Sequence, residues 1–155
     1  MIRHARKEDL PDILKIYNDA IINTTAVYTY DPKELEERLQ WFETKSIAEE
    51  PIWVYVKDHH VVGYATYGSF RDWPAYLYSI EHSIYVDPDY RGQGIASKLL
   101  ETLIQVAKAK NYRTIVVGID ASNVGSIELH KKFNFTHAGT IKNVGYKFER
   151  WLDLA

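Results

Sequence analysis

The sequence predicts a mixed α/β fold in a single domain that spans residues 1–155. Segments rich in β-branched and aromatic residues alternate with segments whose apolar residues recur at helical spacing, so strands and helices interleave along the chain. Two strand segments follow each other across a short polar turn, which indicates an antiparallel hairpin. A chain of 155 residues, 46% of them hydrophobic, is long enough to bury one core but hardly two.

The N-terminal half predicts two helices before the first hairpin. Residues 1–5 predict a short strand, and apolar residues at helical spacing within residues 10–21 predict a helix after it. Residues 31–34, DPKE, combine an acidic N-cap, a first-turn proline and a glutamate suited to a capping box, so we expect a second helix to begin there. Residues 52–56 and 61–70 then predict the two strands of the hairpin.

The C-terminal half continues the alternation. Residues 79–86 predict a strand, and a long helix follows through about residue 110. Residues 114–119 predict another strand, and residues 123–134 predict a further helix. The remaining alternation predicts two closing strands joined near Asn143, which makes about seven strands and four helices in total.

Composition excludes several classes of function. Lys and Arg number 19 against 21 Asp and Glu, a net charge of −2, so the chain lacks the basic excess that binding to nucleic acid requires. The absence of cysteine excludes disulfides, thiolate metal sites and a cysteine nucleophile. No apolar run reaches membrane-spanning length, and the start MIRHARKEDL is too charged for a signal peptide. We therefore expect a soluble, cytoplasmic protein without nucleic acid or membrane partners and, since no histidines show ligand spacing, without a metal.

The stretch DYRGQGIASKLL, residues 89–100, lies between a predicted strand and a predicted helix. Gly92 and Gly94 leave the N–H groups of a helix N-terminus accessible, and Arg91 adds positive charge beside them. This arrangement is typical of an anion site, with phosphate as the expected ligand, although a glycine-rich helix start without a ligand stays open on the motif alone. Ser97 stands where a dinucleotide fingerprint has its third glycine, and no P-loop Gly-Lys-Ser/Thr is present, so both of those sites are excluded.

The order Arg-x-x-Gly-x-Ala at residues 91–96, directly after the strand SIYVDPDY, resembles the coenzyme A pyrophosphate loop of the GNAT superfamily of N-acetyltransferases. The resemblance covers the whole chain, and NVGSIELHKKFNF, residues 123–135, is similar to the superfamily's second coenzyme-contacting segment. The segments IYNDAIINTTAVYTYDP, SIEHSIYV, LHKKFNF and VGYKFERWLDL further resemble the phosphinothricin and methionine sulfoximine/sulfone acetyltransferases. The resemblance implies the GNAT fold, a mostly antiparallel twisted sheet with helices on both faces. It also implies direct transfer of an acetyl group from acetyl-CoA to the α-amino group of a small amino-acid analogue.

The resemblance also implies which residues hold acetyl-CoA. The pantetheine arm is expected to bond the backbone of strand 79–86 as a neighbouring strand does, and the glycine stretch is expected to hold the pyrophosphate. Asn123 predicts a helix N-cap by itself, and the resemblance adds a coenzyme contact. The expected acetyl-CoA-binding residues are Ile84, Tyr85, Val86, Arg91, Gly92, Gln93, Gly94, Ile95, Ala96, Ser97, Asn123 and Ser126.

Direct transfer requires an acceptor amine that has lost its proton, because an α-ammonium with a pKa near ~8 has no lone pair. Glu81 is the expected base, since its carboxylate lies in an otherwise apolar strand, where an unpaired charge is costly. It lies roughly 16 Å along the strand from Val86, toward the acetyl end of the coenzyme. A strand glutamate that faces solvent or pairs with a lysine is the alternative. His130 stands where the resemblance implies a proton or hydrogen-bond donor to the departing thiolate, and a helix-surface histidine is the alternative.

The acceptor is expected in front of Glu81, in a region with many aromatic residues. Arg71 offers a planar cationic fork for an α-carboxylate, and a surface ion pair with Asp72 is the alternative. His82 is expected to point to the sheet face opposite Glu81, so it contributes backbone as well as side chain. The expected acceptor-binding residues are Tyr28, Arg71, Asp72, Trp73, Glu81, His82 and Ser83.

Two other functions stay open on the sequence, and the sequence also predicts a homodimer. A non-catalytic acyl-CoA-binding module keeps the glycine stretch but needs neither Glu81 nor His130, and a protein N-terminal acetyltransferase keeps the chemistry but takes a different acceptor. The C-terminal segment carries more apolar side chains than two terminal strands need, so we predict a symmetric homodimer with these strands near the interface. These side chains are Val144, Tyr146, Phe148, Trp151 and Leu152.

Overall fold

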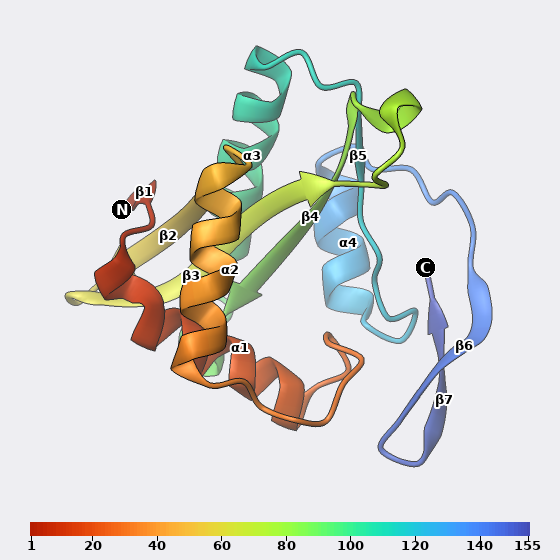
Figure 1. Ribbon diagram of the computed structural model, residues 1–155. Coiled ribbons are helices and arrows are strands. Elements are labelled where there is room, and N and C mark those ends of the chain that lie inside the picture. The colour runs from red at the N-terminus through yellow and green to blue at the C-terminus, as the bar shows by residue number, and fades with distance from the viewer. The chain divides into compact units, whose positions relative to one another are not determined.

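The computed structural model describes residues 1–155 and confirms the mixed α/β fold with seven strands and four α-helices (Figure 1). The strands divide into a five-stranded sheet and a separate two-stranded sheet. The chain forms two compact units, one of Met1–Asn18 and Lys33–Val117, the other of Asp19–Pro32 and Gly118–Ala155.

The first unit contains the five-stranded sheet, in the order β1-β2-β3-β4-β5. Its strands are β1 (Ile2–His4), β2 (Ile52–Lys57), β3 (His60–Ser69), β4 (Ser79–Val86) and β5 (Thr114–Val116). Neighbouring strands are antiparallel except β4 and β5, which are parallel. The predicted hairpin joins β2 to β3, with positive φ at Asp58 and His59, and β5 is shorter than the expected 114–119.

Helices cover both faces of this sheet, as Figure 1 shows for α2 (Leu35–Ile47) in front and α3 (Ile95–Ala109) behind. The first residues of α1 (Leu10–Asn23) pack with α2 on one face, around the buried side chains of Ile13, Val54 and Tyr64. On the other face, α3 packs Leu99 and Leu103 on the sheet. Because successive strand residues point to opposite faces, β4 contributes Tyr85 to the first cluster and Ile84 to the second.

Helix α2 begins later than the DPKE motif predicted. Its N-cap is Glu34, which makes no side-chain cap, and Asp31 lies outside the helix. The reason is a contact from α1, where the side-chain amide of Asn18 donates to the Lys33 carbonyl at 3.0 Å and accepts from the Lys33 N–H at 2.8 Å. The backbone of Lys33 is thus bonded to Asn18 rather than within a helix.

The second unit contains the end of α1, the loop after it, α4 (Val124–Lys132) and a hairpin of β6 (Ile141–Lys147) and β7 (Arg150–Leu154). The turn lies at Phe148 and Glu149, with φ of 53° and 59°, so the predicted turn near Asn143 is wrong. Asn143 also has a positive φ of 54°, but it lies inside β6 at an irregular register. Phe148 is not typical of a tight turn, and Tyr30 holds it there by accepting, at its hydroxyl, the Phe148 N–H at 3.0 Å. None of the helices in either unit has both the length and the apolar character to cross a membrane.

Candidate active site

Strand β4 has an open edge over its second half. Its parallel pairing with β5 ends at Glu81 opposite Val116, whereas its antiparallel pairing with β3 continues to Val86. Residues 82–86 therefore have a strand on one side only. An extended chain that carries amides can add to such an edge as another strand.

The hydrogen bonds at the start of β4 show which residues point their backbone groups at this edge. The Ser79 carbonyl accepts from Phe70 N–H on the β3 side at 3.2 Å, whereas the Tyr78 carbonyl accepts from Arg113 N–H on the β5 side at 2.8 Å. By alternation, His82, Ile84 and Val86 direct their N–H and C=O groups to the open edge. Tyr85, which was also expected to bond the coenzyme, directs its backbone to β3 instead.

The glycine loop follows the end of β4, as the sequence predicted. Gly92 and Gly94 both have a φ of +76°, a left-handed conformation that residues with side chains adopt at a cost. Gly94 is the N-cap of α3 and has no side chain to cap it. The first helical hydrogen bond runs from Lys98 N–H to the Gly94 carbonyl at 3.1 Å, so the N–H groups of residues 95–97 have no helical acceptor. These donors lie at the positive end of a 15-residue helix, a geometry that binds anions.

Two exposed lysines lie beside this loop, and neither was among the residues predicted to bind acetyl-CoA. Lys57, at the end of β2, donates from its ammonium to the side-chain carbonyl of Gln93. Lys98, in the first turn of α3, donates to the Tyr55 hydroxyl at 3.4 Å. With Arg91 they give the loop a positive surface. The sequence around Lys57 does not indicate a role in binding, because Gln93 of the glycine loop lies 36 residues away along the chain. The fold of β2 and β3 brings the two residues together.

Glu81 lies at the point where the open edge begins. Its side chain is exposed and forms no ion pair, so the argument from costly burial in an apolar strand is wrong, although the position along β4 is as predicted. Ser83 lies on the same sheet face and is half-buried. His82 is buried on the opposite face, paired with Tyr67 of the α3-side cluster, so it presents only its backbone to the edge.

Arg71, Asp72 and Trp73 lie in the exposed loop between β3 and β4. The Arg71 guanidinium donates to the Phe70 carbonyl at 2.7 Å and lies 4.2 Å from the centre of the Phe70 ring. It forms no ion pair with Asp72, so the alternative of a surface pair is wrong. Trp73 is 73% exposed. The loop thus presents one cation and one large aromatic side chain to solvent.

In the second unit, α4 holds the predicted cap and histidine. The Asn123 side chain accepts from Ser126 N–H at 3.1 Å, which confirms the N-cap. His130 is 6% exposed, its ring meets Phe135 edge-to-face, and its Nδ1 lies 2.7 Å from the Ser126 carbonyl oxygen. The helix-surface alternative is therefore wrong. Because a carbonyl only accepts, Nδ1 carries a proton, and burial holds the pKa of His130 below its ordinary value despite this hydrogen bond. The favoured form is a neutral imidazole.

Tyr28 lies in the loop after α1, also in the second unit, and is 40% exposed. Its ring lies against Gly145 of β6, where a Cβ would come within 2.7 Å of two ring carbons. Burial, with Asp120 nearby, raises the pKa of the Tyr28 phenol above its ordinary value. The hairpin thus leaves room for this aromatic side chain by having glycine opposite it.

The chain is similar to a family of acetyltransferases and to individual acetyltransferases. Residues 10–135 match the acetyltransferase (GNAT) family. The chain is 43% identical over 154 residues to an L-methionine sulfoximine/L-methionine sulfone acetyltransferase of Pseudomonas aeruginosa, with 99% of this chain and 90% of the relative covered. It is similar to a crystal structure of an N-acetyltransferase from Staphylococcus aureus, at 68% identity and a TM-score of 0.98, with 99% and 93% of the two chains covered. It is also similar to a Salmonella typhimurium acetyltransferase structure with its cofactor acetyl-CoA, at 38% identity and a TM-score of 0.96, with 99% and 89% covered.

Proposed function

The chain belongs to the acetyltransferase (GNAT) family, and we propose that it transfers the acetyl group of acetyl-CoA to the α-amino group of a small amino-acid analogue. Methionine sulfoximine, methionine sulfone and phosphinothricin are acceptors of this type, and the relative from Pseudomonas aeruginosa supports the class. The observation that carries the proposal is the open edge of β4, which runs from Glu81 to the glycine loop before α3.

The residues at this edge fit acetyl-CoA. The N–H groups of residues 95–97, with Arg91, Lys57 and Lys98, supply the donors and positive charge that a pyrophosphate requires. The backbone of Ile84 and Val86 offers ladder positions to the two amides of the pantetheine arm. Bound acetyl-CoA supplies an activated thioester.

Glu81 accepts a proton from the acceptor's α-ammonium. Because its carboxylate is exposed, it does so directly or through a water molecule. The freed amine then attacks the thioester carbonyl and the C–N bond forms. The C–S bond breaks, the nitrogen gives up its second proton as it becomes the amide, and the departing thiolate takes up one proton to become the free thiol. His130 can give this thiolate a proton only from its imidazolium form, since the Nδ1 proton is bonded to the Ser126 carbonyl. In its neutral form His130 is a hydrogen-bond acceptor.

Arg71 holds the acceptor's α-carboxylate in this proposal, and Tyr28 and Trp73 contribute apolar contacts to the acceptor. The guanidinium has no acidic partner of its own, so it is available to a carboxylate. The proposal includes a single domain over residues 1–155, because the family match crosses both compact units. It also includes a cytoplasmic location.

A symmetric homodimer through the β6–β7 hairpin is part of the proposal. Val144, Tyr146 and Trp151 are 50%, 54% and 64% exposed, which leaves an apolar surface on the hairpin. Leu152 is buried, contrary to its inclusion among the interface residues. Light scattering that returns a monomer mass at micromolar concentration contradicts the dimer.

A thiol-release assay with acetyl-CoA tests the activity. The panel contains L-methionine sulfone, L-methionine sulfoximine, L-phosphinothricin, their decarboxylated amines and a peptide with a free N-terminus. We expect release with the three amino acids. Release with the peptide alone indicates a protein N-terminal acetyltransferase, and acetyl-CoA binding without release to any amine indicates a binding module.

A further inference from the structure

Strand β3 is longer than β2 at its C-terminal end, so its last residues have no β2 partner. The first residue of β2, Ile52, lies opposite Thr66, whereas β3 continues to Ser69 and stays paired with β4 over that whole length. Tyr67 and Ser69 share the same alternation, so the Tyr67 carbonyl and the Ser69 N–H point to the side that β2 no longer covers. Backbone groups in such a position need other partners.

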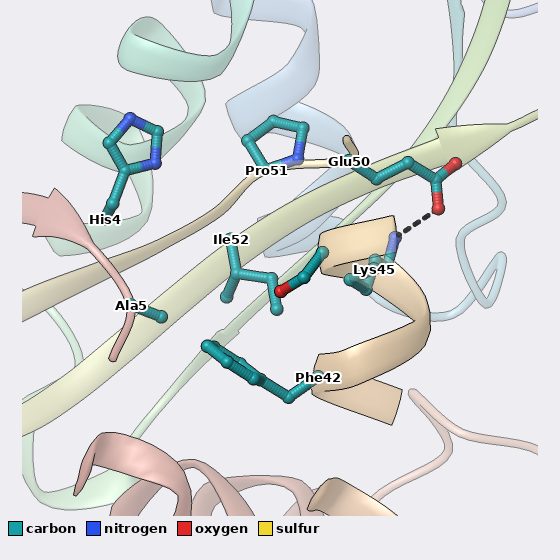
Figure 2. A pocket seen from close by; sticks show the side chains of 8 residues that line it. His4, Ala5, Phe42, Lys45, Glu50, Pro51 and Ile52 are labelled. Atoms are coloured by element: carbon teal, nitrogen blue, oxygen red, sulfur yellow. Dashed lines mark ion pairs between the residues drawn. The ribbon is translucent and has the colours of Figure 1, made fainter. Parts of the chain in front are cut away.

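Lys45 of α2 and Glu50, which follows the helix, supply these partners. The Lys45 ammonium donates to the Tyr67 carbonyl at 2.8 Å, and the Glu50 carboxylate accepts from Ser69 N–H at 3.1 Å. Lys45 Nζ and Glu50 Oε1 lie 3.6 Å apart, as the dashed line in Figure 2 shows. One side chain thus provides the donor and the other the acceptor that a neighbouring strand would have provided.

The ion pair lies over the residue that faces Glu81. Gly68, between the two bonded residues, is opposite Glu81 in the β3–β4 register. A Cβ at Gly68 would lie 3.0 Å from Glu50 Oε2 and 3.3 Å from Lys45 Nζ. Opposite residues of antiparallel strands point to the same face with Cβ atoms about 4.5–5.5 Å apart, so the pair and the Glu81 side chain share one patch of the sheet.

We infer that Lys45 and Glu50 are positioning residues for the transfer, because they fix the β3 backbone against which Glu81 is held. Beyond Glu81, β4 has no partner strand on its β5 side. The position of β4 there is therefore fixed by its pairing with β3. The Lys45 side chain is 14% exposed, which limits competition from water for its bond to Tyr67. This inference rests on the proposed role of Glu81 as the base.

The test compares Lys45→Met and Glu50→Met with Glu50→Gln, in the whole chain with acetyl-CoA and L-methionine sulfone. Both methionine variants lose a backbone bond, so we expect kcat to fall about ten-fold while KM for acetyl-CoA stays within about two-fold. Glu50→Gln keeps an oxygen that accepts the Ser69 N–H, so its kcat is expected to stay closer to wild type. Hydrogen exchange at the Ser69 amide is expected to speed up in Glu50→Met and not in Glu50→Gln.

Lys108→Met, at an exposed position of α3, is the matched control for loss of a lysine. Unchanged kcat in both methionine variants, or equal losses in Glu50→Gln and Glu50→Met, overturns the positioning role. Failure of the proposed base role of Glu81 is seen separately, because Glu81→Gln then keeps the wild-type kcat, and failure of the proposed activity is seen as no thiol release by the wild-type chain. If Glu81→Gln is impaired and the Lys45 and Glu50 variants are not, only the positioning role is wrong.

Discussion

Lys147 is a buried ammonium that holds the loop on which Tyr28 lies. Its side chain is 1% exposed, and its Nζ donates to the carbonyls of Ile21, Thr24 and Val27 at 2.6, 2.7 and 2.7 Å. An ammonium has three donors, and each has a carbonyl here. The end of α1 and the following loop are therefore tied to β6 at one point in the second unit.

Lys147→Met keeps an unbranched apolar side chain and removes all three donors. Hydrogen bonds to charged groups contribute about 1.5–3 kcal/mol each. Removing the charge also removes a desolvation penalty of several kcal/mol, so the net loss is well below the sum of the three bonds. We expect the free energy of unfolding to fall by about 2–4 kcal/mol, since three carbonyls lose their partner. For a chain of this size the Tm then falls by about 5–15 °C.

Thermal unfolding followed by circular dichroism measures this fall in Tm. Lys147→Ala allows a more specific test of the same hydrogen bonds. Alanine leaves space for the missing propylammonium group beside the three carbonyls. Added n-propylammonium is therefore expected to raise the Tm of Lys147→Ala but not that of Lys147→Met, whose side chain fills the space. Because the loop carries Tyr28, KM for the acceptor is expected to rise while KM for acetyl-CoA holds. A Tm within about 2 °C of wild type in both variants, with no rescue, refutes the reasoning.

Three further predictions concern single side chains. Glu81→Gln is expected to lower kcat far more than acetyl-CoA affinity, and a wild-type kcat from about pH 6 to 9 excludes it as the base. Arg71→Ala is expected to raise KM for an amino-acid acceptor by roughly ten- to a hundred-fold, the loss of a carboxylate–guanidinium contact worth ~1.5–3 kcal/mol, with KM for acetyl-CoA unchanged. If the enzyme acts equally on the amino acids and on their decarboxylated amines, Arg71 does not bind the acceptor's α-carboxylate. Burial of Asp120 opposes its charge, but bonds from Thr25 and Ser122 outweigh this and hold its pKa below the ordinary 3.8. Its stabilisation is present above pH 3.8 and is lost as the pH falls through the lower pKa of the folded state, so acid unfolding curves of Asp120→Asn should show less pH dependence in that range.

The types and order of the elements could be predicted from the sequence, but the end of β5, the start of α2 and the last turn could not. Apolar periodicity and the glycines are local signals, which is why β4, the glycine loop and α3 lie where expected. The start of α2 depends on Asn18, which bonds the Lys33 backbone from another helix. The turn at Phe148 depends on Tyr30, 118 residues earlier in the chain. The errors at α2 and at the last turn both arose where a distant side chain bonds a backbone group.

The same distinction applies to the candidate site. The sequence identified groups by residue type, and Glu81 and Asn123 lie where their segments predicted. It gave no reason to single out Lys57, Lys45 or Lys147, because a lysine has the same local pattern whether it faces solvent or a carbonyl. Their roles depend on which backbone groups the fold leaves without a partner, and that is a property of strand and helix ends in three dimensions.

Lys45 and Lys147 each donate hydrogen bonds to backbone carbonyls at the end of a regular element, one in each compact unit. At the end of α1, and where β2 leaves β3, regular structure stops and carbonyls lose their ladder or helix donors. Water can bond such groups but leaves the backbone free to move, whereas a lysine anchored in a packed element fixes it. Each lysine acts next to a residue that we propose to meet the acceptor, Glu81 in one unit and Tyr28 in the other. Loss of either ammonium group should therefore lower acceptor turnover more than it weakens acetyl-CoA binding. Acetyl-CoA binding depends on the glycine loop and the edge of β4.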